Sequence, residues 1–302
     1  MPTDVTDLAA LLPSWQLALR AERKSPSTVA SYSEGVRAFL RWAKAAGVTA
    51  EVTKIAVQTF ITDLLDSGAE AATARTRYAA LRRFAAWLAE EGEIDPDPLL
   101  DMKPPRVDNK VVEALTDEQL RLLIKACAGK QLIDRRDEAI VRLMAETGVR
   151  AGEVIGIQVS DLDLKEGRAT VRRGKGGTGG TGRTVPFGAQ TAAAIDRYIR
   201  ARRTHRLSAT AALWLGGGGQ TFSYAGLNVS LKRRAGAAGI EGFHLHLLRH
   251  TAATRWLRAG GSEQGLMSVA GWSTRAMMDR YTGASAAERA AAEARGLNLG
   301  DL

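Results

Sequence analysis

The sequence predicts a mainly helical protein of two domains, and three observations support this fold class. Apolar residues recur at helical spacing along most of the 302 residues. A polar, proline-bearing stretch interrupts that pattern at residues 96–112. Two runs containing threonine and valine, 168–173 and 183–187, flank a glycine-rich loop and predict a hairpin. We therefore expect an N-terminal helical bundle over 1–95 and, over 113–302, a mixed α/β domain that is mostly helical with a small antiparallel β-sheet.

Four amphipathic helices with short connections are expected in the N-terminal region. Pro13 is expected near the start of the first. Ser25 followed by Pro26 begins the second, and Gly47 ends it. The fourth is expected at about residues 71–88. Its arginines fit either a solvated face or a face laid along DNA, and the scarcity of acidic residues in this helix favours DNA. They are Arg75, Arg77, Arg82 and Arg83.

The second domain is expected to open with a helix whose start is marked by a capping box at Thr116 and Gln119. A further helix should end at Gly148, and a short one should follow Ala151. Helices then dominate the rest of the chain. Their expected positions are about 189–204, 223–238, 246–259, 262–270, 274–282 and a terminal helix at 285–295.

The composition indicates a soluble globular protein, with 45% hydrophobic and 25% charged residues. The net charge of +9 fits either solubility alone or a polyanionic partner, most simply nucleic acid. Cys127 is the single cysteine, which excludes an internal disulfide and a cysteine-based metal site. No apolar run reaches membrane-spanning length and the N-terminus lacks a signal-peptide pattern, so we expect a cytoplasmic, DNA-associated protein without a membrane partner.

The chemistry-bearing residues lie in the second half of the chain. Tyr281 follows Trp272 by nine residues, and His246 and Arg249 lie one helical turn apart upstream. Tyrosine is a weak nucleophile because its usual pKa is about 10. Its attack on a phosphodiester therefore needs the phosphate charge neutralised and the phenol aimed in line. Arginine suits this task, because its planar fork binds two phosphate oxygens and keeps its charge. Arg249 and Arg150 are therefore the two candidates for binding the phosphate.

Other residues could complete such a site. Glu153 follows Arg150 by three residues and could support neighbouring groups. Lys175 stands at the tip of the expected hairpin, where a cation could reach a phosphate. Trp272 can donate through its indole N–H, and His250 fits a structural role. Taken singly, each residue also has an ordinary interpretation as a solvated or core side chain, and the histidines near 244–250 do not suggest a metal site.

The order and spacing of these residues resemble the tyrosine recombinase family, which includes phage integrases and Xer-type recombinases. The family pattern runs T-G-x-R-x-x-E, a hairpin G-K-G, H-x-x-R-H, glycine with histidine or tryptophan, and tyrosine nine residues later. The local sequence is most similar to that of actinobacterial or actinobacteriophage integrases. The matching residues are Thr147-Gly148-Val149-Arg150 with Glu153, Gly174-Lys175-Gly176, His246 to His250, Gly271-Trp272 and Tyr281.

The resemblance implies that Tyr281 attacks a scissile phosphate, giving a 3′-phosphotyrosine and a free 5′-hydroxyl. It implies that Lys175 protonates the departing 5′ oxygen. Glu153 and His250 stay candidates for supporting roles on their position in the sequence. The resemblance further implies that the reaction needs no ATP, metal or other cofactor. The residues implied to hold the phosphate are Arg150, Arg249, His246 and Trp272.

The resemblance also implies partners: double-stranded DNA held in a C-shaped clamp, a tetramer on DNA, and room for accessory or directionality factors. The helix at 285–295 is the candidate for docking into a neighbouring protomer. Two departures stand out, namely Trp272 where histidine is commoner and a long, glycine-rich loop around Lys175. We expect no separate arm-site-binding module before the first bundle. The rival interpretations are a type IB topoisomerase and a DNA-binding protein that has lost catalysis.

Overall fold

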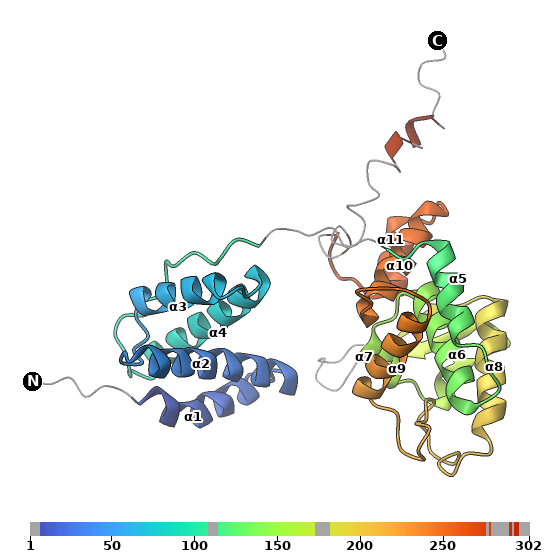
Figure 1. The fold of residues 1–302 in the computed structure, drawn as a ribbon, viewed down its shortest axis with the longest axis horizontal. Coiled ribbons are helices and arrows are strands. Elements are labelled where there is room, and N and C mark those ends of the chain that lie inside the picture. Colours follow the sequence, from blue (N-terminus) through green and yellow to red (C-terminus); the bar gives the residue numbers. More distant parts are fainter. Residues whose placement is uncertain are drawn as a thin grey trace, which may run out of the picture. The chain divides into compact units, whose positions relative to one another are not determined.

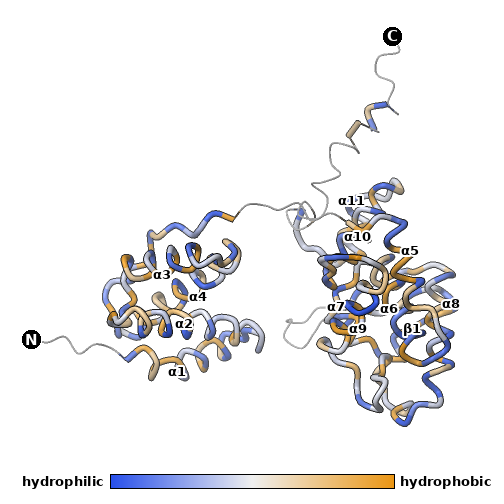
Figure 2. Tube along the Cα trace, in the orientation of Figure 1, coloured by the Kyte–Doolittle hydropathy of each residue, from blue (hydrophilic) through white to orange (hydrophobic). Residues whose placement is uncertain are grey.

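The chain forms two compact units, Met1–Lys110 and Val111–Leu302, each built around its own core (Figure 1). The computed structural model describes residues 7–107, 114–172 and 182–275, together with 278, 290–291 and 293–295. Along the helices of both units, apolar and hydrophilic residues alternate (Figure 2), as expected when one side of each helix packs against a core.

Four helices make up the described part of the first unit. Asp7 caps the first of them by accepting the backbone N–H of Ala9 at 3.0 Å. Because the helix begins at this cap, Pro13 lies inside it, and the expectation that Pro13 sits near the helix start is corrected. The predicted start at Ser25 and the left-handed stop at Gly47 (φ 67°) are confirmed for the second helix. The bounds are α1 (Leu8–Ala21), α2 (Pro26–Ala46), α3 (Lys54–Asp66) and α4 (Ala71–Glu90).

The core of this unit is aromatic and extends into the stretch that was expected to be linker. Leu99 and Met102 are buried in it, and the Tyr78 hydroxyl donates a hydrogen bond to the Met102 carbonyl. The predicted linker over 96–112 therefore differs from the structure in its first part. The reason is that burying the apolar side chains of Leu99 and Met102 stabilises the core, and an extended linker would leave both exposed to water.

Helices α2 and α4 approach each other closely at Gly35. A Cβ added there would overlap the Cβ of Ala80. We predict that Gly35→Val lowers the unfolding free energy of this unit by about 1–3 kcal/mol through overpacking. Ala30→Val is the control for placing a valine on the same helix, because Ala30 is exposed and its replacement changes helix propensity without overpacking. Equal thermal midpoints for the two variants would contradict the packing explanation.

The second unit combines helices with a small sheet of strand order β1-β2-β3 in which neighbours are antiparallel. The predicted hairpin is confirmed, with Ala169 opposite Val185. The two-residue strand β1 was not predicted, because it is too short to show an alternating pattern. The bounds are α5 (Asp117–Ala126), α6 (Leu132–Thr147), α7 (Ala151–Ile155), β1 (Leu162–Asp163), β2 (Arg168–Val171), β3 (Arg183–Pro186), α8 (Ala189–Arg202), α9 (Tyr224–Ala237), α10 (Leu245–Arg258) and α11 (Glu263–Ala270).

Helix α6 is central to this unit and packs against both α8 and α10. The capping box predicted at the start of α5 is confirmed: Thr116 Oγ1 accepts the Gln119 N–H at 3.1 Å and Gln119 Oε1 accepts the Thr116 N–H at 3.0 Å. Burial raises the pKa of the Cys127 thiol to about 12, so this cysteine is a core residue and not a nucleophile. The expected helix at 274–282 lies mostly outside the described residues, and so does the one at 285–295.

None of the described helices is long and apolar enough to cross a membrane. Within the same residues, no group of three or more His, Cys, Asp or Glu side chains could hold a metal ion.

Candidate active site

The end of α6 positions Arg150. Gly148 terminates that helix in the left-handed conformation (φ 64°), which redirects the chain within two residues. Arg150 then stands immediately before α7, and its backbone N–H donates to Glu153 Oε2 at 2.9 Å. Glu153 thus caps the helix that follows Arg150, and the three-residue spacing in the sequence has a direct structural reason.

Glu153 binds two arginine side chains. Arg150 Nη1 donates to Oε1 at 3.0 Å, while Arg183 donates from Nη1 to Oε1 at 2.9 Å and from Nη2 to Oε2 at 2.7 Å. Burial by itself would raise the pKa of this carboxyl group, but hydrogen bonds from Arg183 and from the Arg150 N–H lower it to about 2. Glu153 is therefore ionised at physiological pH and acts as a fixed acceptor, not as a proton donor.

A second arginine reaches the same region from α10. Arg249 is only 1% exposed, and its Nη1 donates to the carbonyl of Gly148. Its guanidinium carbon lies 4.8 Å from the centroid of the Trp272 ring. Arg150 Nη2 donates to the carbonyl of Gly271 at 3.1 Å, one residue before Trp272. Two cations that are far apart in the sequence are thereby tied to the same two turns, at Gly148 and Gly271.

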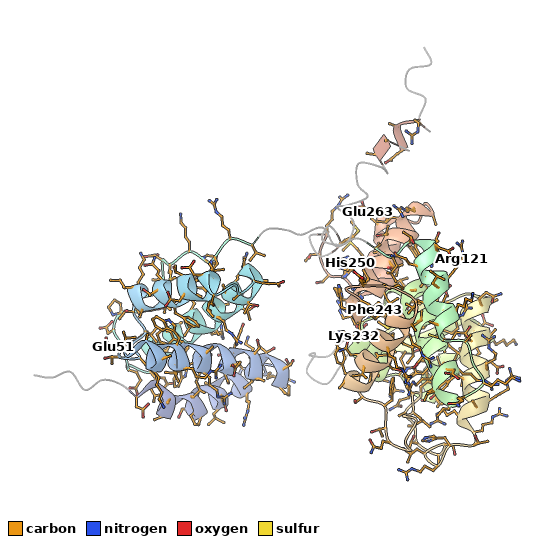
Figure 3. The ribbon with its side chains drawn as sticks, in the orientation of Figure 1. Glu51, Arg121, Lys232, Phe243, His250 and Glu263 are labelled. Carbon is orange, nitrogen blue, oxygen red and sulfur yellow. The ribbon has the colours of Figure 1, made fainter. Side chains whose placement is uncertain are left out.

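Two histidines lie on α10 beside Arg249. The rings of His246 and His250 form an edge-on pair with centroids 5.3 Å apart, and Figure 3 shows His250 on this helix. Burial, followed by the neighbouring charge of Arg249, lowers the pKa of His246. Burial and the charge of His246 lower the pKa of His250 to about 4. Both rings are therefore neutral near pH 7, and each can donate one hydrogen bond and accept another.

Trp272 follows the last turn of α11. Gly271 caps that helix in the left-handed conformation (φ 66°), and the Trp272 N–H returns to the Met267 carbonyl at 2.9 Å. The indole is 5% exposed and packs with Ala253 and Leu257 of α10. Trp272 is both a core residue and a neighbour of Arg249. The sequence offered a core role and a role in the active site, and the two are compatible.

The structure thus brings together six of the eight residues predicted for the active site. Lys175 and Tyr281 lie outside the described residues. Val171 and Arg183, strand residues on either side of the segment that contains Lys175, are paired across the sheet. Arg183 was not predicted as a site residue; the only available signal was a basic residue at the first position of an expected strand. The six are Arg150, Glu153, His246, Arg249, His250 and Trp272.

The four arginines predicted to bind DNA do not share one environment. Arg75, Arg82 and Arg83 line a groove beside α4, together with Trp15 and Trp87, which are buried. Within that groove, Arg82 donates to the Leu100 carbonyl at 3.2 Å and Arg83 pairs with Glu22. Arg77 is not part of the groove, and its guanidinium lies 3.9 Å from Glu34 of α2.

Two stretches of the chain match known protein families. Residues 113–288 match the family model described as the phage integrase family. The chain belongs to the phage integrase family. Residues 12–92 match a second model, the phage integrase N-terminal SAM-like domain. The predicted class is confirmed: the protein is a tyrosine recombinase, an enzyme of site-specific DNA recombination.

Relatives and solved structures agree with this assignment. Tyrosine recombinase XerC of Xanthomonas campestris pv. campestris (strain B100) is 28% identical over 268 residues, covering 87% of this chain and 81% of the relative. Tyrosine recombinase XerD of Corynebacterium glutamicum is 29% identical over 285 residues, covering 90% and 92%. The recombinase shares its fold with the XerH recombinase bound to a palindromic difH substrate (TM-score 0.73, 16% identity, 95% and 84% covered). It also shares it with a lambda integrase dimer bound to a COC′ core site (TM-score 0.71, 16% identity, 91% and 94% covered). The predicted fold class, mainly helical with a small antiparallel sheet, is thereby confirmed.

Proposed function

We propose that this recombinase cleaves and rejoins double-stranded DNA through a 3′-phosphotyrosine formed on Tyr281. The observation that carries the proposal is the convergence of Arg150 and Arg249 on the turns at Gly148 and Gly271. Two guanidinium groups held at one pair of turns form a natural receptor for an anion that offers two oxygens, such as a phosphodiester.

In this mechanism the Tyr281 oxygen attacks phosphorus while the bond to the 5′ oxygen breaks, and Lys175 donates a proton to that oxygen. Arg150 and Arg249 neutralise the charge that develops on the non-bridging oxygens. His246 is neutral near pH 7, so it can take up the phenolic proton at one ring nitrogen and donate to the phosphate from the other. The phosphotyrosine keeps the energy of the broken bond, so rejoining needs neither ATP nor a metal.

The burial of Arg249 adds a requirement to this mechanism. With 1% of its surface exposed, the side chain becomes accessible to a phosphate only when groups around it move. We propose that DNA binding produces this movement, so that the complete site exists only on DNA.

For the assembly, we propose that the two units clamp double-stranded DNA, with residues 1–95 as the core-DNA-binding domain and 113–302 as the catalytic domain. We propose further that four protomers act together and that the segment 285–295 docks into a neighbour. Support comes from the solved lambda integrase, which shares the fold and is described as a tetramer bound to a Holliday junction. Integration, excision or a related recombination is the proposed natural reaction, and accessory or directionality factors are proposed as further partners.

Trapped covalent complexes test this function. DNA that stays attached to denatured protein in the native host would first be sequenced to recover the site. A nicked duplex carrying that site, whose cleavage releases a short fragment and blocks rejoining, should then accumulate a covalent adduct. Intact sites should exchange strands between two duplexes. Relaxation of supercoiled DNA by a monomer without strand exchange would instead indicate a topoisomerase.

The groove beside α4 supports a separate prediction about DNA affinity. Replacing Arg75, Arg82 and Arg83 together by glutamine should weaken binding and lower the slope of log K against log salt by up to about 0.9 for each phosphate that the variant no longer neutralises. Arg77→Gln is the control, because Arg77 lies outside the groove and near Glu34. An unchanged slope for the triple variant would show that this groove does not track the DNA backbone.

A further inference from the structure

Arg183 joins three parts of the catalytic unit. It is the first residue of β3, and Lys175 lies eight residues before it in the sequence. Both of its terminal nitrogens bind the Glu153 carboxylate in α7, and its Nε donates to the Val269 carbonyl in α11 at 2.8 Å. About one fifth of the side chain is exposed, so these bonds lie in a partly desolvated setting where they are stronger than at the surface.

We infer that Arg183 is a positioning residue for strand cleavage, which holds Glu153 so that Arg150 keeps its guanidinium turned toward the scissile phosphate. The inference rests on the proposed function, in which Arg150 binds that phosphate. Arg183 itself is not proposed to touch DNA at the scissile bond.

The hydrogen-bond geometry supplies the physical reason. Arg183 occupies both oxygens of Glu153, so the guanidinium of Arg150 engages that carboxylate through Nη1 alone, while its Nη2 donates to the Gly271 carbonyl. Without Arg183, the ionised carboxylate would be free to form a two-bond fork with Arg150. Such a fork is the preferred arginine–carboxylate arrangement, and it would withdraw from the phosphate the N–H groups that Arg150 should present.

The glycine at position 271 fits the same interpretation. A Cβ placed there would lie 2.8 Å from Cζ and 2.9 Å from Nη1 of Arg183. The Arg183 guanidinium thus rests against the bare backbone of the turn that leads to Trp272. A side chain at this position would push Arg183 away from Glu153, and the positive φ of 66° already disfavours one. Arg183 therefore links the placement of Arg150 to that of the Trp272 turn.

The test compares cleavage rates on two substrates. Single-turnover cleavage is measured for wild type, Arg183→Gln and Arg183→Lys on the nicked duplex that carries the recovered site. The second substrate has a methylphosphonate at the scissile position, where a neutral methyl group replaces a charged non-bridging oxygen. Arg168→Gln is the matched control, because Arg168 lies in β2 of the same sheet and binds Asp163 through Nε at 3.2 Å and Nη2 at 3.0 Å.

Arg183→Gln should slow cleavage of the phosphodiester by about 30- to 100-fold, the size expected for a misplaced catalytic group, with DNA affinity little changed. Arg183→Lys should lose part of this rate, because lysine keeps the charge but not the fork. On the neutral methylphosphonate the loss should shrink to about tenfold or less, since less charge remains for Arg150 to stabilise. Arg168→Gln should stay near wild type on both substrates.

Equal losses on the two substrates would overturn the inference, because a defect confined to folding or scaffolding does not depend on the charge of the phosphate. Cleavage by both Arg183 variants within about threefold of wild type would also overturn it. If Arg183→Gln does not fold, as judged by its thermal midpoint, the comparison is made with Arg183→Lys. If wild type cleaves neither of the two substrates, the proposed function fails, and this inference fails with it.

Discussion

Arg249→Ala is expected to lower the rate of single-turnover cleavage by about 10³-fold or more, with a much smaller effect on DNA affinity. The guanidinium is almost fully buried beside Trp272 and the end of α6, so its charge acts in a medium of low polarity. Removing one preorganised donor from such a site typically costs about 10²–10³ in rate, and loss of a full charge should cost at least as much.

Arg255→Ala provides the control for this prediction. Arg255 lies on the same helix, is about half exposed and pairs with Asp117 at 3.0 Å, so its loss should leave cleavage within about twofold. Arg249→Lys should remain strongly impaired, because an ammonium group does not reproduce the two-point contact. Cleavage by Arg249→Ala within tenfold of wild type, in protein that is folded and binds DNA, would remove Arg249 from the phosphate site.

The helices were predictable because a core-facing stripe repeats every three to four residues and because caps such as Ser25 and Thr116 mark helix starts. Errors occurred where tertiary contacts overrode local signals. Pro13 looks like a helix start, yet Asp7 caps the helix earlier. Leu99 and Met102 lie among prolines, yet they fill the core of the first unit. Nothing in the local sequence shows that a core is available to them.

The site was predictable to the extent that its residues have fixed chemistry and order. The three-residue spacing was enough to predict that Arg150 and Glu153 lie together, because the Glu153 carboxylate caps the helix that Arg150 precedes. The ties of Arg150 and Arg249 to two glycine turns depend on long-range packing and were not foreseeable. Arg183 was missed for the same reason: its partners, Glu153 and Val269, are distant in the sequence.

Tyr281→Phe is expected to abolish covalent attachment to DNA while leaving the affinity for the site nearly unchanged. Phenylalanine keeps the ring and lacks the oxygen that would bond to phosphorus, so neither positioning nor charge on the remaining residues can replace it. This prediction has the largest expected effect, because the loss is of the reaction itself.

Mapping the attachment site on the trapped complex tests the role of Tyr281 without any intermediate inference. Wild-type protein and Tyr281→Phe are incubated with the nicked duplex, digested with a protease and analysed by mass spectrometry for peptides that carry a nucleotide remnant. We expect one modified peptide in wild type, with the remnant on Tyr281 through a 3′-phosphate, and none in the variant. A remnant on another residue, or as much adduct with Tyr281→Phe as with wild type, would contradict the proposed nucleophile.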